Sequence, residues 1–213
     1  MTPFGADGRL VSPQGAPVPA ICEMDASDLL RAIKARELSV EEVVTAFLDR
    51  IEAVNPTYNA IVSLRPSEAI LAEAREADRR LAAGEPGGAL YGLPVAIKDL
   101  SPTKGLTTTF GSPIFRDFVP DEDGIATARM RAAGAIIIGK TNTPEFGLGS
   151  HSFNEVFGAT GNAFDSARSA GGSSGGAAVA LALRMLPIAD GSDMGGSLRN
   201  PAAFNNVYGL RPS

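Results

Sequence analysis

Residues 170–190 read AGGSSGGAAVALALRMLPIAD: a glycine- and serine-rich loop, a helix-compatible run and a short apolar run in succession. Two similar short apolar runs come earlier in the chain, LPVAI at 93–97 and AIIIG at 135–139, and a helix is expected between them near 124–133. Buried strands that alternate with helices are typical of a sheet enclosed by helices. The pattern predicts an α/β fold with a parallel sheet inside helices.

The segment before residue 84 predicts four further elements, namely helices over 27–36, 40–54 and 66–83 and a short strand over 58–63. The helices are indicated by apolar residues at helical spacing. Ser39 and Glu42 form a capping box ahead of the second helix, and Asn55-Pro56 is expected to end it.

Composition limits the classes of function. The chain has 213 residues, of which 44% are hydrophobic and 20% charged, and its net charge is -5. This balance is that of an ordinary globular protein, and we expect one domain over 1–213. The basic residues are scattered, which argues against direct binding of nucleic acid.

The N-terminal residues, the apolar stretches and the cysteine content indicate the cellular compartment of the protein. Residues 1–22 resemble a loose arm, since Pro and Gly interrupt them and no apolar core of a secretory signal is present. No apolar stretch approaches the ~20 residues of a membrane span. Cys22 is the single cysteine, which excludes an intrachain disulfide and a cysteine-based zinc site. We expect a cytoplasmic protein that is not integral to a membrane.

The loop GGSSGG at 171–176 is the strongest local signal, because its glycines allow close backbone approach just before a helix. Such a loop can hold an active-site serine. It can also offer free backbone N–H groups to a phosphate, although the lysine of a P-loop is missing.

The second signal is GSDMGGSLRNPAAF at 191–204, where two glycines again lead into a serine and a helix-compatible run. The consecutive backbone amides of Met194, Gly195, Gly196 and Ser197 could form an oxyanion hole around a carbonyl that Ser197 attacks. The nucleophile and the oxyanion hole would then share one turn.

A nucleophilic serine needs a base, and the sequence offers two candidates. His151 is the only histidine, and a lone loop histidine is more often structural than catalytic. Lys98 follows the apolar run LPVAI, where a strand would carry it from the core to the edge of the sheet. Burial there would lower the pKa of its amine enough for a neutral base, whereas a surface position would leave it an ordinary charged lysine.

Three stretches together resemble the signature motifs of the amidase signature family: GLPVAIKD at 92–99, GGSSGG at 171–176 and GSDMGGSLRNPAAF at 191–204. Their order and their spacing both agree, with 75 residues from Lys98 to Ser173 and 24 from Ser173 to Ser197. The resemblance implies a catalytic triad in which Lys98 is the base, Ser173 the bridge and Ser197 the nucleophile.

The same resemblance implies further features of the site. A peptide bond at Ser173, Gly172-Ser173 or its neighbour, is expected to be cis, and Ser174, Asp193 and Arg199 are expected to support the triad by hydrogen bonding. It implies hydrolysis of a small-molecule amide through an acyl-enzyme, with ester cleavage as a side activity. No metal or organic cofactor is expected.

Members of the family act on diverse amides, and one is an amidotransferase subunit that supplies ammonia from glutamine for tRNA-dependent amidation. The sequence of residues 191–213 resembles that of the bacterial hydrolases, such as those acting on 6-aminohexanoate cyclic dimer, more than that of the amidotransferase subunit. The amidotransferase subunit remains the alternative function.

The resemblance also implies a mixed, largely parallel sheet covered by helices. It implies an incomplete domain as well, because enzymes of the family are about twice as long. NNVYGLRPS at 205–213 reads as a strand-like run after which the sequence stops. A sheet without its remaining strands would expose an edge, which favours aggregation or pairing, so a homodimer and a catalytically inert fragment both stay open.

Overall fold

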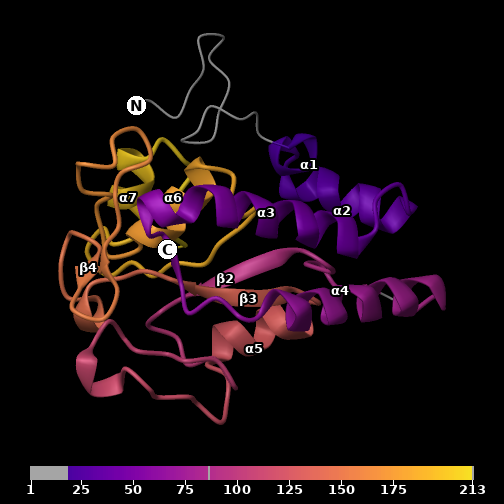
Figure 1. The fold of residues 1–213 in the computed structure, drawn as a ribbon, viewed down its shortest axis with the longest axis horizontal. Helices are drawn as coiled ribbons and strands as arrows, with labels where there is room; N and C mark the ends of the chain where they lie inside the picture. The colour runs from indigo at the N-terminus through magenta and orange to yellow at the C-terminus, as the bar shows by residue number, and fades with distance from the viewer. Residues whose placement is uncertain (1–18, 86, 213) are drawn as a thin grey trace.

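The computed structural model describes residues 19–85 and 87–212, and its arrangement is drawn in Figure 1. The helices are α1 (Ala20–Glu23), α2 (Ala26–Ala35), α3 (Val40–Tyr58), α4 (Ser67–Ala82), α5 (Ile125–Ala132), α6 (Gly175–Ala182) and α7 (Arg199–Phe204), with 3-10 turns η1 (Pro113–Phe115) and η2 (Glu145–Gly147). The strands are β1 (Ile61–Val62), β2 (Pro94–Lys98), β3 (Ile136–Thr141), β4 (Phe153–Asn154) and β5 (Gly158–Ala159).

A three-stranded mixed sheet organises the fold, with the order β1-β3-β2. β3 pairs with β2 in parallel and with β1 antiparallel, and the register sets Lys98 opposite Thr141. β4 and β5 form a separate antiparallel pair. The predicted α/β class with a mixed sheet is confirmed.

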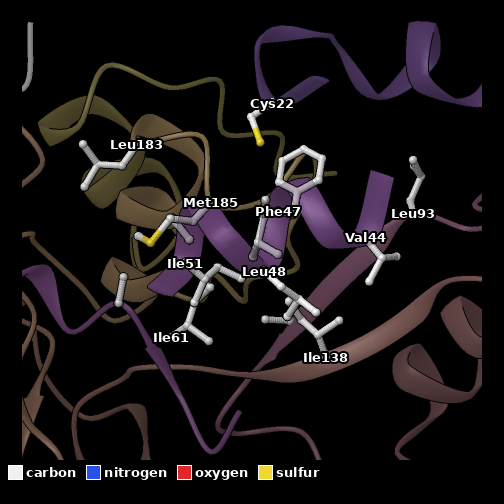
Figure 2. Packing of buried hydrophobic residues seen from close by; sticks show 14 of the residues in the cluster. Cys22, Val44, Phe47, Leu48, Ile51, Ile61, Leu93, Ile138, Leu183 and Met185 are labelled. Atoms are coloured by element: carbon white, nitrogen blue, oxygen red, sulfur yellow. The ribbon is translucent and has the colours of Figure 1, made fainter. Parts of the chain in front are cut away.

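The two faces of the sheet are covered by different elements because side chains alternate along a strand. Ile136 and Ile138 of β3 belong to the larger apolar cluster, which includes Phe47 of α3, whereas Ile137 packs in a second cluster with Met130 of α5. Figure 1 shows α3 and α5 on opposite sides of the sheet, and Figure 2 shows Ile138 facing the side chains of α3.

α3 begins where the sequence predicts, but it ends later. The capping box of Ser39 and Glu42 is present. The helix continues through Pro56 to Tyr58, so the proline lies in its last turn instead of ending it. The side chain of Asn55 stabilises the chain just after the helix by accepting from the amides of Ala60 and Ile61. The strand expected over 58–63 is therefore reduced to Ile61–Val62.

Two runs that read as strands are not strands. Residues 186–190 (LPIAD) and 207–212 have neither helix nor strand in the structure. Pro187 cannot donate to a strand ladder, and the side chain of Asp190, in place of a backbone carbonyl, bonds the amide of Lys98 on β2. Apolar composition made these runs resemble strands, but it does not distinguish a paired strand from an extended loop. Of residues 186–190 only Leu186 is buried, and Tyr208 and Leu210 are exposed.

Most of the N-terminal arm expected over residues 1–22 cannot be compared with the structure. Residues 1–18 of the expected arm lie outside the described part of the chain. Its last residues belong to α1, where Cys22 is buried and its thiol contacts the backbone oxygen of Ala46. In the described part, no helix is both long and apolar enough to cross a membrane.

α6 lies against the sheet at the distance that only glycine allows. The helix contacts β1, β2 and β3, and a Cβ placed on Gly176 would lie 2.4 Å from the amide nitrogen of Asn142 and 2.5 Å from the backbone oxygen of Ala60. Backbone atoms cannot move aside as a flexible side chain can. The glycines of 171–176 thus serve the packing of α6 as well as the loop before it.

We predict that Gly176→Ala lowers the free energy of unfolding by about 3 kcal/mol or more, because the added methyl group forces α6 away from the sheet. Urea unfolding followed by circular dichroism measures the change. Gly195→Ala is the matched control, since nothing lies within 4 Å of a Cβ at that position. Equal stability of both variants would show that α6 can shift without cost.

Candidate active site

Lys98 ends β2 and its side chain is 1% exposed. Its Nζ donates to three serine hydroxyls, at 2.7 Å to Ser173, 2.9 Å to Ser174 and 2.9 Å to Ser192. An ammonium group has three donors, so this cage uses its full capacity. The lysine is therefore held at one point by residues of two separate loops.

Burial lowers the pKa of Lys98 to about 8, against the opposing influence of the Asp190 and Asp193 carboxylates. A lysine in water titrates near 10.4 and is almost entirely charged at neutral pH. In this site a substantial fraction of the amine is neutral under mildly alkaline conditions. The side chain can then accept a proton from a neighbouring hydroxyl.

Ser173 and Ser174 are buried in the loop that leads into α6. The peptide bond between Gly172 and Ser173 is cis, as the resemblance implies. Ser152 secures this loop, because its hydroxyl donates to the Ser173 carbonyl oxygen and accepts from the amide of Gly175. Both hydroxyls are consequently presented to Lys98 from a fixed backbone.

Ser197 lies half-buried in the turn before α7. Its carbonyl oxygen accepts a hydrogen bond of 2.8 Å from the amide of Ser174, which joins the two serine loops directly. Among the described residues, no hydrogen bond links the Ser197 hydroxyl to that of Ser173. The structure thus brings Lys98 onto Ser173 by a side-chain contact and brings Ser197 beside them through the backbone.

Asp193 and Arg199 form a two-pronged ion pair, with distances of 2.9 Å from Nε to Oδ2 and 3.0 Å from the second nitrogen to Oδ1. Asp193 also accepts from the amides of Gly196 and Leu198, at 2.7 and 3.2 Å. The Arg199 guanidinium, followed by these amides, holds the pKa of Asp193 well below its usual range. The pair closes the turn that carries Ser197.

The Asp193 contact bears on the expected oxyanion hole. The amide of Gly196 already donates to Asp193, whereas within the described chain the amides of Met194, Gly195 and Ser197 donate to no protein acceptor. Of the four amides that the sequence suggests, these three are the ones available to a substrate oxygen. The Gly196 amide instead shapes the turn.

The phosphate-cradle alternative is disfavoured because the three amides at the start of α6 already have acceptors. Ser174 donates to the Ser197 carbonyl, Gly175 to the Ser152 hydroxyl and Gly176 to the Asn142 carbonyl. An anion at the start of α6 would have to displace all three acceptors. The loop is built to fix serine side chains.

His151 lies beside the glycine-rich loop 171–176. Its Nδ1 lies 2.7 Å from the Ser169 hydroxyl, and its backbone packs against Gly172 so closely that a Cβ there would lie 2.8 Å from the His151 nitrogen. Within the described part of the chain it bonds neither Ser173 nor Ser197. The structural interpretation of this histidine is the one that the geometry favours.

Sequence reasoning missed three groups near Lys98. Ser192 completes its hydroxyl cage, and Asp190 accepts its backbone N–H. Lys140 is a second buried lysine, which donates to Thr103 and to the Ser101 carbonyl, and burial lowers its pKa to about 8. Lys140 could have been found, since it follows the apolar run 135–139 in the same way as Lys98 follows 93–97.

Comparison with known proteins gives one family. A family model described as Amidase matches residues 42–213. Curated relatives include the glutamyl-tRNA(Gln) amidotransferase subunits A of Azoarcus sp. (strain BH72), 46% identical over 88% of this chain, and of Thermosynechococcus vestitus (strain NIES-2133 / IAM M-273 / BP-1), 47% identical over 87%. The chain spans 38% of the length of each.

Solved structures give the same result. A bacterial aryl acylamidase of the amidase signature enzymes matches with a TM-score of 0.84 at 35% identity, over 89% of this chain and 39% of that one. Fatty acid amide hydrolase matches at 0.83 and 32%, over 87% and 33%. A 6-aminohexanoate cyclic dimer hydrolase complexed with substrate matches at 0.76 and 32%, over 86% and 36%. The resemblance drawn from the three motifs is confirmed.

The lowered pKa of Lys98 predicts a pH-dependent stability. Between about pH 8 and pH 10.5 the unfolded chain still holds the lysine proton that the folded chain has released, so stability rises with pH. Lys98→Met removes this contribution. As pH rises, we expect the free energy of unfolding of the variant to increase less than that of the wild type, by up to ~1.4 kcal/mol per pH unit.

Urea unfolding at about pH 8, 9 and 10 measures this difference. Lys104→Met is the control, because Lys104 is exposed and its loss should leave the slope unchanged. Parallel slopes for the wild type and Lys98→Met would contradict a neutral, buried Lys98.

Proposed function

Because the chain belongs to the amidase family, which its match over residues 42–213 shows, we propose that its lysine-serine site hydrolyses a carboxylic amide through an acyl-enzyme. The observation that carries the proposal is the 2.7 Å hydrogen bond between Nζ of the buried Lys98 and the Ser173 hydroxyl. A lysine shielded from water next to a serine is the arrangement that a serine-activating base requires.

The proton follows the order Ser197, Ser173, Lys98. Neutral Lys98 takes the Ser173 proton while Ser173 takes that of Ser197, and the Ser197 oxygen forms a bond to the amide carbonyl carbon. The C–N bond of the tetrahedral intermediate then breaks as the proton returns along the same path to the leaving amine. Water repeats the sequence on the acyl-enzyme, which releases the acid and restores Ser197.

The oxyanion of the intermediate is assigned to the amides of Met194, Gly195 and Ser197. These amides lie in the turn that the Asp193–Arg199 pair closes, so their directions are set before substrate arrives. Ser174 and Ser192 hold the amine of Lys98 alongside Ser173. This mechanism is complete without metal or cofactor.

The substrate is assigned by class as a small-molecule amide, with esters as easier acyl donors for the same nucleophile. Aryl acylamidase, fatty acid amide hydrolase and 6-aminohexanoate cyclic dimer hydrolase are all among the structural relatives, so the family relation alone selects none of their substrates. The single, buried Cys22 is in keeping with a reducing, cytoplasmic setting.

We predict that a fluorophosphonate probe labels the chain at Ser197, as located by mass spectrometry of the digested protein. Ser197→Ala abolishes labelling, and Lys98→Ala and Ser173→Ala each slow it about 100-fold or more, because the nucleophile loses its base or the link to it. Below about pH 8 the labelling rate of the wild type should rise with pH as Lys98 becomes neutral.

His151→Ala is the matched control, and it should label at the wild-type rate. A loss of labelling in this variant together with full labelling of Lys98→Ala would reverse the assignment of the base. Unlabelled wild-type chain that is folded by circular dichroism would contradict an assembled site in these 213 residues.

The second candidate is an amidotransferase subunit, which the 46% identity to the Azoarcus relative favours. A hydrolase turns over simple amides without a partner, whereas a subunit that supplies ammonia acts on glutamine and depends on the complex in which the ammonia is used. We predict release of ammonia from simple aliphatic or aryl amides by the isolated chain, measured by a coupled ammonia assay.

Glutamine is the comparison substrate in the same assay, and Ser197→Ala is the blank. Turnover confined to glutamine would overturn the hydrolase proposal in favour of the amidotransferase subunit. Faster turnover of the simple amides would support the hydrolase.

A further inference from the structure

Asp190 contacts the proposed base through the backbone. Its Oδ1 accepts a hydrogen bond of 2.6 Å from the amide of Lys98, whereas the next amide, that of Asp99, donates to Thr141 on β3. Successive amides of a strand point to opposite edges, so the Lys98 amide faces the edge of β2 that β3 leaves free. Asp190 occupies that edge at the one residue that carries the base.

Asp190 also lies among the buried charges of the site. Its carboxylate acts on the ammonium groups of both Lys98 and Lys140 and favours their charged forms. The other carboxylates that act on these two lysines are Asp193 on Lys98, and Asp99 and Asp123 on Lys140. Burial raises the pKa of Asp190 itself, and the two lysines oppose that shift.

These two contacts have separate consequences. The hydrogen bond fixes the backbone at the end of β2, from which the Lys98 side chain reaches its three hydroxyls. The charge opposes the effect of burial and so limits how far the amine is driven to its neutral form. The position and the protonation of Lys98 would then both depend on Asp190, which is not one of the three serines that bond its amine.

We propose that Asp190 is a positioning residue for Lys98, which it holds at the free edge of β2 by the hydrogen bond to its amide and whose charge state it controls. Its catalytic consequence rests on the proposed function, in which Lys98 is the base. Its effect on the titration of Lys98 does not.

The titration is measured directly by NMR on protein with isotope-labelled lysine. The chain has four lysines, Lys34, Lys98, Lys104 and Lys140, so the spectrum holds four side-chain signals, and Lys98→Met and Lys140→Met assign the two buried ones. In Asp190→Asn the oxygen acceptor is kept and the charge is lost. The midpoint of Lys98 should fall by about one pH unit, because the protonated form loses its partner.

Asp123→Asn is the matched control. Asp123 is paired with Arg131 and acts on Lys140, so its loss should leave the midpoint of Lys98 in place. Asp190→Ser, which also keeps an oxygen and removes the charge, repeats the test if Asp190→Asn fails to fold. An unchanged Lys98 midpoint in a folded Asp190 variant would overturn the proposal.

Labelling by the fluorophosphonate probe separates the two roles of Asp190. In Asp190→Asn the rise of the rate with pH should move to lower pH with the Lys98 midpoint, while the plateau rate is kept within about threefold. Asp190→Ala, which lacks the acceptor, should lose about tenfold or more at the plateau. Equal plateau rates for these two variants would overturn the positioning role.

The two proposals fail in different ways. A wild-type chain that is folded but not labelled would contradict the proposed function, and the lysine titration would still decide the role of Asp190. A labelled wild type with an unmoved Lys98 midpoint in Asp190→Asn would contradict only the inference about Asp190.

Discussion

The site depends on a lysine that is removed from water. Leaving Lys98 in the core would cost several kcal/mol if its amine had no partners, and the three serine hydroxyls offset only part of that cost for the charged form, whose pKa is lowered. Because the hydroxyls come from loops 171–174 and 191–198, both loops must arrive at the end of β2 in fixed positions. The packing and hydrogen bonds around the two loops hold them in those positions.

The loops are fixed by close packing of the backbone. Gly172 lies against the backbone of His151, and Gly176 lies against Asn142 and Ala60, at separations that exclude a Cβ. Ser174 ties the first loop to Ser197, and Asp193 ties the second loop to α7. Close packing and hydrogen bonds of this kind are what fix side chains on irregular segments, which are otherwise positioned less precisely than those on helices and strands.

The sequence could predict those parts of the fold in which burial and periodicity act locally. Apolar spacing placed α3 and α4, and the runs at 93–97 and 135–139 located β2 and β3 to within one or two residues. It could not predict that 186–190 forms no strand, because strand formation depends on a partner and on Pro187. It ended α3 too early because it took Pro56 as the end of the helix, whereas the proline lies in the last turn.

The candidate site shows the same division. Three motifs sufficed to bring Lys98, Ser173, Ser174, Asp193 and Ser197 into one hypothesis, since each motif has its own residue pattern. Ser192 and Asp190 escaped because the resemblance assigns them no role, and their contacts with Lys98, across 94 and 92 residues, leave no local signal in a single sequence. The four consecutive amides at 194–197 looked equivalent in the sequence, and only the structure shows that Asp193 has taken one of them. The carboxylate that shapes the turn therefore also decides which of the four amides stay available for the proposed oxyanion hole.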